Sequence, residues 1–157
     1  MIQVQSHVLS YALSGLSKAV LRTLQLIAGF RMPASFMTLI AILAEKELNP
    51  TSEHTIVFSE AEQDHALTVL EDKGLLGWDR RSNRYDLHPI VRGVVWKNLD
   101  QKTQYEIHES LRRYFEAMPA IENYMQVGSI VDVRPAIELY NTLVGLKLYN
   151  EACHVFH

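Results

Sequence analysis

The sequence predicts a mainly α-helical fold in which three helices precede a β-hairpin and further helices follow it. Apolar residues recur at helical spacing over most of the 157 residues. Two short runs with strand character, 75–78 and 85–88, flank a polar segment in which Ser82 and Asn83 mark a turn. The hydrophobic share of 48% is sufficient for a buried core, and the length suits one domain, or one domain with an appendage.

The first two helices are defined by apolar periodicity and by residues that start or stop a helix. The first is expected over residues 16–28, with Ser17 as its N-cap and Gly29 as its stop. Pro33 is expected to occupy the first turn of the second helix, over residues 34–44, because its fixed φ suits that position.

The third helix has the clearest local signal in the chain. A short strand-like run at 55–58 precedes Ser59-x-x-Glu62, the pattern of a capping box in which each side chain satisfies a free backbone N–H. The helix is expected to reach Lys73 and to stop at Gly74. The hairpin follows directly, and three helices followed by a hairpin is the order of elements in a winged helix.

The remaining chain is predicted to be helical. Pro89 opens a helix through Leu99, and Asp100 caps another over 101–118 whose apolar face includes Tyr105. Two shorter helices are expected at the C-terminal end. The predicted organisation is an N-terminal helix or linker (1–14), a winged-helix domain (15–99) and a helical region (100–157).

The segment 77–98, GWDRRSNRYDLHPIVRGVVWKN, resembles the end of the winged-helix domain in STAND (NB-ARC) signalling NTPases. In that family a wing strand ends in a hydrophobic residue, a histidine and a third residue, and a helix follows. Leu87-His88-Pro89 matches this motif, although Pro89 stands where plant and animal members usually carry Asp. Residues 16–43 resemble the entry to the same domain, and the proline form is closer to bacterial members.

The C-terminal segment 139–156 resembles a tetratricopeptide-type helical hairpin. Tyr149, Ala152 and Phe156 have the spacing of the second helix of that repeat, where a small residue lets two helices approach. Helical repeats commonly follow the winged helix in STAND proteins. One such hairpin cannot bury both of its faces, so it needs further repeats or a neighbour.

The resemblance implies a nucleotide switch, but this chain lacks the phosphate-binding loop G-x-x-x-x-G-K-[ST]. ATP hydrolysis by the chain alone is therefore not expected, and ADP or ATP would bind to a nucleotide-binding domain located in an N-terminal part or on another chain. The resemblance implies that His88 contacts the phosphates of bound ADP in the intact protein. Alternatively, His88 satisfies a backbone carbonyl at a strand-to-helix corner.

Charge separates two interpretations of the winged helix. The hairpin and the helix after it, residues 79–97, carry a net charge of +3, and Arg80, Arg81 and Arg84 are candidates for contacts with phosphate groups or a partner. The alternative is a solvated hairpin. The third helix, 59–73, carries a net charge of −4, which would be repelled by DNA in the major groove. Sequence-specific nucleic-acid binding is therefore not expected.

The expected function is that of a non-catalytic regulatory or interaction module that couples a nucleotide-binding domain to helical repeats. A protein partner is expected on the repeats, at a packing surface that also favours self-association of the isolated chain. The alternative is a winged-helix transcriptional regulator with a helical dimerisation or sensing domain. The candidate packing surface comprises Tyr140, Leu143, Leu148 and Phe156.

No residue cluster indicates catalysis or a metal site. The single cysteine, Cys153, lies beside His154 on a predicted helix, where adjacent side chains diverge, so packing in the core is expected rather than an activated thiol. No resident cofactor and no metal are expected. One cysteine and the lack of a signal peptide or a continuous membrane-spanning apolar run indicate a cytoplasmic protein without a membrane partner.

Overall fold

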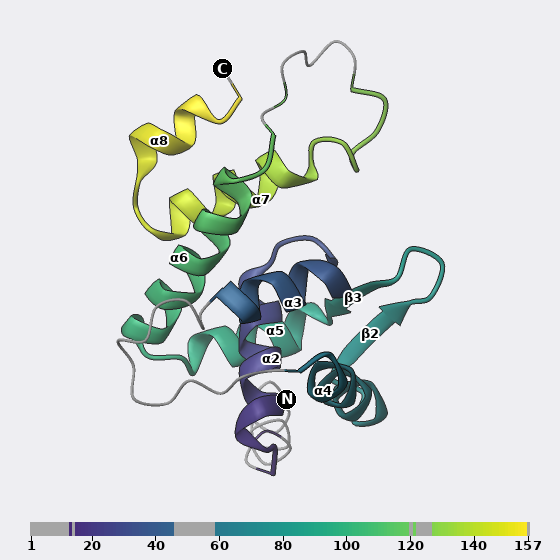
Figure 1. Cartoon of the computed structure of the whole chain (residues 1–157). Coiled ribbons are helices and arrows are strands. Elements are labelled where there is room, and N and C mark those ends of the chain that lie inside the picture. The colour runs from purple at the N-terminus through teal and green to yellow at the C-terminus, as the bar shows by residue number, and fades with distance from the viewer. Residues whose placement is uncertain (1–12, 14, 46–58, 120, 122–126, 157) are drawn as a thin grey trace.

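Seven helices and a three-stranded antiparallel sheet form the part of the chain that the structure describes, and the protein is mainly helical (Figure 1). The computed structural model describes residues 13, 15–45, 59–119, 121 and 127–156. The expected strand at 55–58 and nearly all of the expected N-terminal segment 1–14 lie outside these residues.

Helix α2 (Lys18–Gly29) begins where Ser17 caps it, as predicted: the backbone N–H of Val20 donates to the Ser17 hydroxyl at 3.3 Å. The helix ends at Gly29, as predicted, but Gly29 does not adopt the left-handed conformation that often ends a helix. A Cβ on Gly29 would lie 2.7 Å from Cγ2 of Ile107 and 3.1 Å from Cδ1 of Leu111. Gly29 therefore allows α2 and α6 to approach each other closely.

The segment after α2 corrects one prediction. Residues 34 and 35, expected at the start of the second helix, form the short strand β1 (Ala34–Ser35), and helix α3 (Phe36–Glu45) begins only after it. The Ser35 hydroxyl accepts from the backbone N–H of Thr38 at 3.1 Å and so satisfies a free donor in the first turn of α3. Pro33 thus precedes a strand because β1 finds a partner in β3, far along the chain.

The third helix and the hairpin agree with the prediction. Helix α4 (Glu60–Asp72) starts with both hydrogen bonds of the Ser59–Glu62 capping box, and Gly74 follows it with a φ of +66°. Strands β2 (Leu76–Asp79) and β3 (Arg84–Leu87) form the hairpin, and Asn83 adopts the positive φ that its turn requires. β1 pairs with β3 on the other side, so the sheet order is β1-β3-β2, and all pairings are antiparallel.

Two helices connect the hairpin to the C-terminal region. Helix α5 (Pro89–Lys97) has proline in its first turn, and helix α6 (Gln101–Glu116) is capped by Asp100, whose carboxylate accepts from the N–H of Thr103 at 2.7 Å. Tyr105, predicted on the apolar face of α6, is 58% exposed. It lies on the solvent side of a helix whose buried positions are Ile107, Ser110, Leu111 and Phe115.

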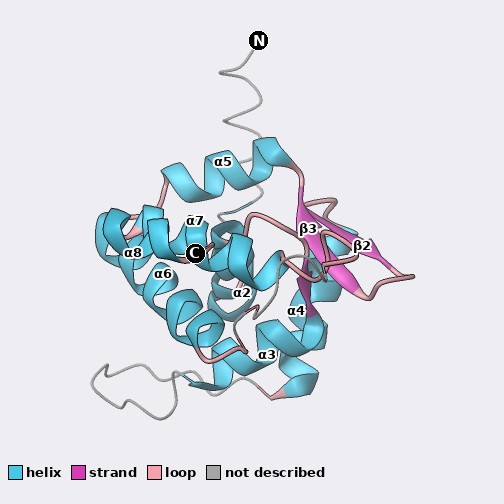
Figure 2. Ribbon diagram, turned by 90° about the horizontal axis from the view of Figure 1, so that it is seen from above, coloured by secondary structure: helices cyan, strands magenta, loops and turns pink. Residues whose placement is uncertain are grey.

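The C-terminal helices are α7 (Arg134–Gly145) and α8 (Tyr149–His154). Helix α6 packs against α2 and α3, and α7 packs along α6 (Figures 1 and 2). The α6 residues Ile107, Leu111 and Phe115 belong to the same hydrophobic core as α2, and Leu139 of α7 packs against that core. A single core therefore extends from α2 to α7. Cys153, expected in the core, is exposed on α8, whereas Ala152 beside it is buried.

Candidate functional site

His88 occupies the corner between β3 and α5, where it is the N-cap of α5. Its Nδ1 accepts from the backbone N–H of Ile90 at 3.3 Å, and the side chain is exposed. Because Nδ1 is the acceptor, a neutral His88 carries its proton on Nε2. The corner therefore presents an N–H donor to solvent, where an external acceptor can reach it.

The arginines of the hairpin do not act alike. Arg80 and Arg81 are exposed near the tip, and the Arg80 guanidinium lies 5.1 Å from the centre of the Trp78 ring, in cation–π range. Arg84 is instead half-buried, and its Nη1 donates to the backbone carbonyl of Pro33 at 3.2 Å. Arg84 therefore lies where β3 meets β1 and not beside Arg80 and Arg81 near the tip.

Helix α4 presents an acidic surface beside the hairpin. Glu60, Glu62, Asp64 and Asp72 are exposed, while Ala66, Leu67 and Leu70 are buried. Gln63, the amide on this helix that could have read a base, is 1% exposed, and its Oε1 accepts from the Thr23 hydroxyl at 3.2 Å. It is therefore used in the contact between α4 and α2 and not at the surface.

A polar cleft of about 440 Å³ opens beside the His88 corner, between α5, α6, α7 and the end of α2. Pro89 and Arg92 of α5 line it, together with Arg31, and His108 of α6 lies at its wall. Arg92 forms an ion pair with Asp86 of β3. The Trp96 and His108 rings lie 4.8 Å apart. Burial, reinforced by the charge of Arg31, lowers the pKa of His108, so the two arginines supply the positive charge of this cleft.

A buried carboxylate joins α7 to the loop between α2 and β1. Glu138 is 1% exposed; both of its oxygens accept from the backbone N–H of Arg31, each at 3.1 Å, and Oε1 also accepts from Met32 at 2.6 Å. Burial raises the pKa of Glu138, and these backbone donors partly oppose the rise. Glu138 is not among the functional residues predicted from the sequence. The available signal was its spacing with Thr142, since both lie on the buried face of α7.

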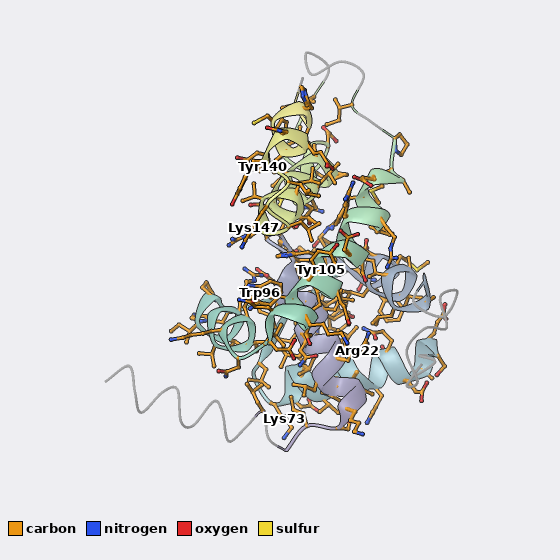
Figure 3. The ribbon with its side chains drawn as sticks, turned by 90° about the vertical axis from the view of Figure 1, so that its left-hand side faces the viewer. Arg22, Lys73, Trp96, Tyr105, Tyr140 and Lys147 are labelled. Atoms are coloured by element: carbon orange, nitrogen blue, oxygen red, sulfur yellow. The ribbon has the colours of Figure 1, made fainter. Side chains whose placement is uncertain are left out.

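The candidate packing surface on the C-terminal helices is only partly exposed. Tyr140 and Phe156 are 40% and 42% exposed, their ring centres are 5.8 Å apart, and Tyr140 lies on the outer side of α7 (Figure 3). Leu148 is half-buried and Leu143 is buried, so these two residues contribute to the interior of the α7–α8 pair.

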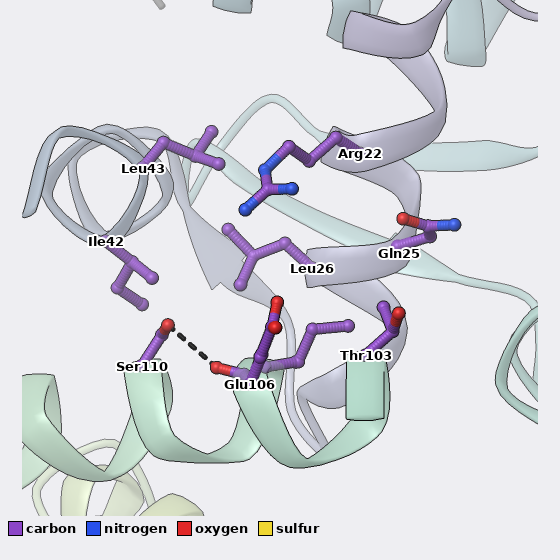
Figure 4. Close-up of a pocket in the computed structure, with 9 residues that line it drawn as sticks. Arg22, Gln25, Leu26, Ile42, Leu43, Thr103, Glu106 and Ser110 are labelled. Carbon is purple, nitrogen blue, oxygen red and sulfur yellow. Dashed lines mark hydrogen bonds between the residues drawn. The ribbon is translucent and has the colours of Figure 1, made fainter. Parts of the chain in front are cut away.

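Another pocket, between α2, α3 and α6, has a volume of only about 30 Å³ (Figure 4). Its walls include Leu26, Ile42 and Leu43, and the Ser110 hydroxyl is bound to the backbone carbonyl of Glu106 at 2.9 Å. This space suits one or two water molecules and not an organic ligand.

Comparison with family models, with curated proteins and with solved structures found no match for this chain. Within the described residues, no group of three or more His, Cys, Asp or Glu side chains is placed to hold a metal ion. Within the same residues, every helix is too short or too polar to span a bilayer.

Proposed function

We propose that residues 15–99 form the winged helix of a STAND-type switch protein and act as a non-catalytic regulatory module. Helices α2, α3 and α4 provide its three helices, and β2 and β3 provide its wing. The insertion of β1 between the first two helices, with sheet order β1-β3-β2, supports this assignment because it completes a small sheet at the base of the wing.

The observation that carries the proposal is the position of His88. It follows the last wing strand, caps the next helix through Nδ1 and leaves its Nε2–H donor in solvent. A donor at this corner is suited to a phosphate oxygen held by a neighbouring nucleotide-binding domain, and a domain rotation would withdraw it. The chain has no phosphate-binding loop of its own, so the nucleotide would be held by that domain and His88 would sense it.

The contact between α7 and the loop before β1 supports a role in coupling. The buried Glu138 bonds to the backbone at Arg31 and Met32, so a displacement of the winged helix would carry α7 with it. In this proposal α7 and α8 begin a series of helical repeats. Their exposed Tyr140 and Phe156 would meet the next repeat or a protein partner.

The proposal is tested with a nucleotide-binding domain supplied in trans. A phosphate-binding-loop domain encoded beside this chain is purified and mixed with it, and association is measured by calorimetry with and without ADP. We expect ADP-dependent association that is about tenfold weaker for His88→Asn. Asparagine is a good N-cap, so this variant keeps the start of α5 while removing the Nε2 donor.

His65→Gln is the matched control, because His65 is an exposed histidine on α4 away from the corner. Equal affinity of His88→Asn and the unaltered chain would reject the sensing role. In a separate titration of this chain alone with ADP we expect no saturable heat. Micromolar binding would contradict a module that depends on another domain for its nucleotide.

The second candidate function is a DNA-binding transcriptional regulator. The exposed Arg80 and Arg81 near the wing tip favour it, since arginines there can contact a phosphate backbone. The exposed carboxylates of α4 oppose it, because this is the helix that would enter the major groove.

A further inference from the structure

Two arginines from distant parts of the chain line one small pocket. The pocket lies where the start of α7 meets β1 and β3, has a volume of about 110 Å³, and is lined by Arg84 and Arg134 together with Ser35, Thr38 and Glu138. Arg84 is the first residue of β3, and Arg134 is the first residue of α7. The pocket therefore lies between the sheet and the C-terminal helices.

Arg134 has buried donors without acceptors. Its Nε and Nη1 are inaccessible to solvent, and neither atom has a hydrogen-bond partner among the described residues. A buried charged donor without an acceptor is unfavourable, because it has lost its water and gained nothing in exchange. Two of the three guanidinium nitrogens thus lack a hydrogen-bond acceptor.

Glu138 lines the same pocket but does not fill this role. Its two carboxylate oxygens accept from the backbone N–H groups of Arg31 and Met32. Although Glu138 is one turn along α7 from Arg134, the ion pairs found among the described residues do not join the two. The carboxylate is thus committed to the loop before β1.

Arg84 adds a second positive charge at the same place. One of its nitrogens, Nη1, donates to the carbonyl of Pro33, which fixes the guanidinium at the pocket. Burial and the neighbouring charge of Arg84 lower the pKa of Arg134, and the charge of Glu138 opposes this shift only in part. The start of α7, which has no side-chain cap, contributes a further positive potential from the helix dipole.

We propose that this pocket binds a small oxyanion, of the size of one phosphate or sulfate group, between the guanidinium groups of Arg84 and Arg134. Its volume far exceeds the roughly 10–15 Å³ that one water requires, and it suits a tetrahedral group of five heavy atoms. Guanidinium groups bind such oxyanions through short, charge-assisted hydrogen bonds. The bound anion would link the hairpin to α7. This inference does not depend on the proposed function.

The experiment is a titration of the full chain with inorganic phosphate at constant ionic strength, with sodium chloride as the balancing salt. The arginine Nε–Hε signals are followed by NMR. We expect saturable shifts of the Arg84 and Arg134 signals, and a rise in Tm of roughly 3–6 °C at a phosphate concentration ten times Kd. Arg84→Gln and Arg134→Gln should each weaken binding about tenfold or more. Arg113→Gln, which alters an exposed arginine of α6 that does not line this pocket, should leave Kd unchanged.

The stability of Arg134→Gln provides an independent measurement. Without phosphate this variant should melt at the same temperature as the unaltered chain or higher, because an unpaired buried charge has been removed. At saturating phosphate it should melt lower. Equal responses of the two proteins to phosphate, or equal responses to phosphate and chloride, would overturn the proposal.

Two further arms distinguish the source of the anion and guard against a variant that does not fold. Titration with sulfate and with O-phosphoserine separates a free ion from a phosphoryl group carried by a larger molecule, and saturable binding of any of these at the two arginines supports the site. If Arg134→Gln fails to fold, the NMR titration of the unaltered chain and of Arg84→Gln decides. Absence of saturable shifts with every anion would reject the site.

Discussion

The backbone N–H of Met32 donates to Oε1 of Glu138 at 2.6 Å, across 106 residues of sequence. This bond and the pair from Arg31 place a buried carboxylate of α7 against the loop that leads into β1. Any motion of the sheet relative to the C-terminal helices has to preserve or break this contact. Because both donors are backbone groups, substitutions in the loop other than proline leave them in place.

Glu138→Ala is expected to lower the free energy of unfolding by about 1–3 kcal/mol or more, because two backbone donors lose their acceptor in a buried place. Equilibrium denaturation by urea measures the change. Glu151→Ala is the control: Glu151 forms an exposed ion pair with Arg112 at 3.0 Å, and its loss should cost less than about 1 kcal/mol. Equal costs for the two variants would show that the contact contributes no more than a surface ion pair.

The pKa of Glu138 is raised above its ordinary value, mainly by burial, so the folded protein binds this proton more tightly than the unfolded chain does. This group therefore makes stability rise as the pH falls from neutral through the raised pKa, and the gain is complete below the ordinary pKa of Glu. As the pH falls through this interval, we expect the unfolding free energy of the unaltered chain to rise relative to that of Glu138→Gln. A difference that is independent of pH, or that moves in the opposite direction, would contradict the raised pKa.

Gly145→Ala is expected to be destabilising because Gly145 packs against the His108 ring. A Cβ at this position would lie 2.2 Å from Cε1 of His108, so the His108 ring, which packs against Trp96, would have to shift. Overpacking of this kind costs roughly 1–3 kcal/mol, which exceeds the benefit of about 0.5–1 kcal/mol that alanine brings to a helix. Gly93→Ala is the matched control, since no atom lies within 4 Å of its added Cβ, and it should stabilise α5. Thermal melts of both variants measure the contrast, and two changes of the same sign would contradict it.

Local sequence signals were sufficient for most helices and for the hairpin. Ser17, Asp100 and the Ser59–Glu62 pair act on N–H groups within three residues, so their effect can be read without knowing the rest of the fold. The positive φ angles of Gly74 and Asn83 are local in the same way. These positions show that a capping or turn residue predicts an element boundary when its partner is close in sequence.

The features that sequence reasoning missed depend on distant partners. β1 is two residues long and exists because Ala34 pairs with Tyr85, so its own composition predicted a helix instead. Arg84 was predicted as a candidate for contacts with phosphate groups or a partner, but its hydrogen bond to Pro33, 51 residues away, could not be predicted from the local sequence. Glu138 reads as a surface residue by composition, since a buried carboxylate is tolerated only where donors converge on it. The candidate site around His88 was predicted from its motif. The cleft beside it could not be predicted, because it forms only where α2, α5, α6 and α7 come together.

His88→Ala is expected to cost about 0.5 kcal/mol of stability, at the low end for an N-cap, because the Nδ1 bond to Ile90 is 3.3 Å long and exposed. His88→Asn should recover that loss, since asparagine accepts the same kind of bond. Chemical denaturation of the two variants measures the difference. If both lose the same stability, the imidazole stabilises the corner by packing and not by capping.

Duplex DNA distinguishes the two candidate functions. We expect no saturable binding of a duplex by this chain at physiological salt, as measured by fluorescence anisotropy, because the exposed face of α4 carries four carboxylates and Gln63 is buried. Replacing Asp64 and Glu60 by Asn and Gln should raise weak binding at low salt, since it removes repulsion at the helix that would face the groove. Arg80→Gln with Arg81→Gln should reduce that residual binding, because it removes the exposed positive charge near the wing tip.

Micromolar or tighter binding by the unaltered chain, falling steeply with salt and lost in the arginine variant, would favour the transcriptional regulator. It would also mean that the wing, rather than α4, supplies most of the contact with the nucleic acid.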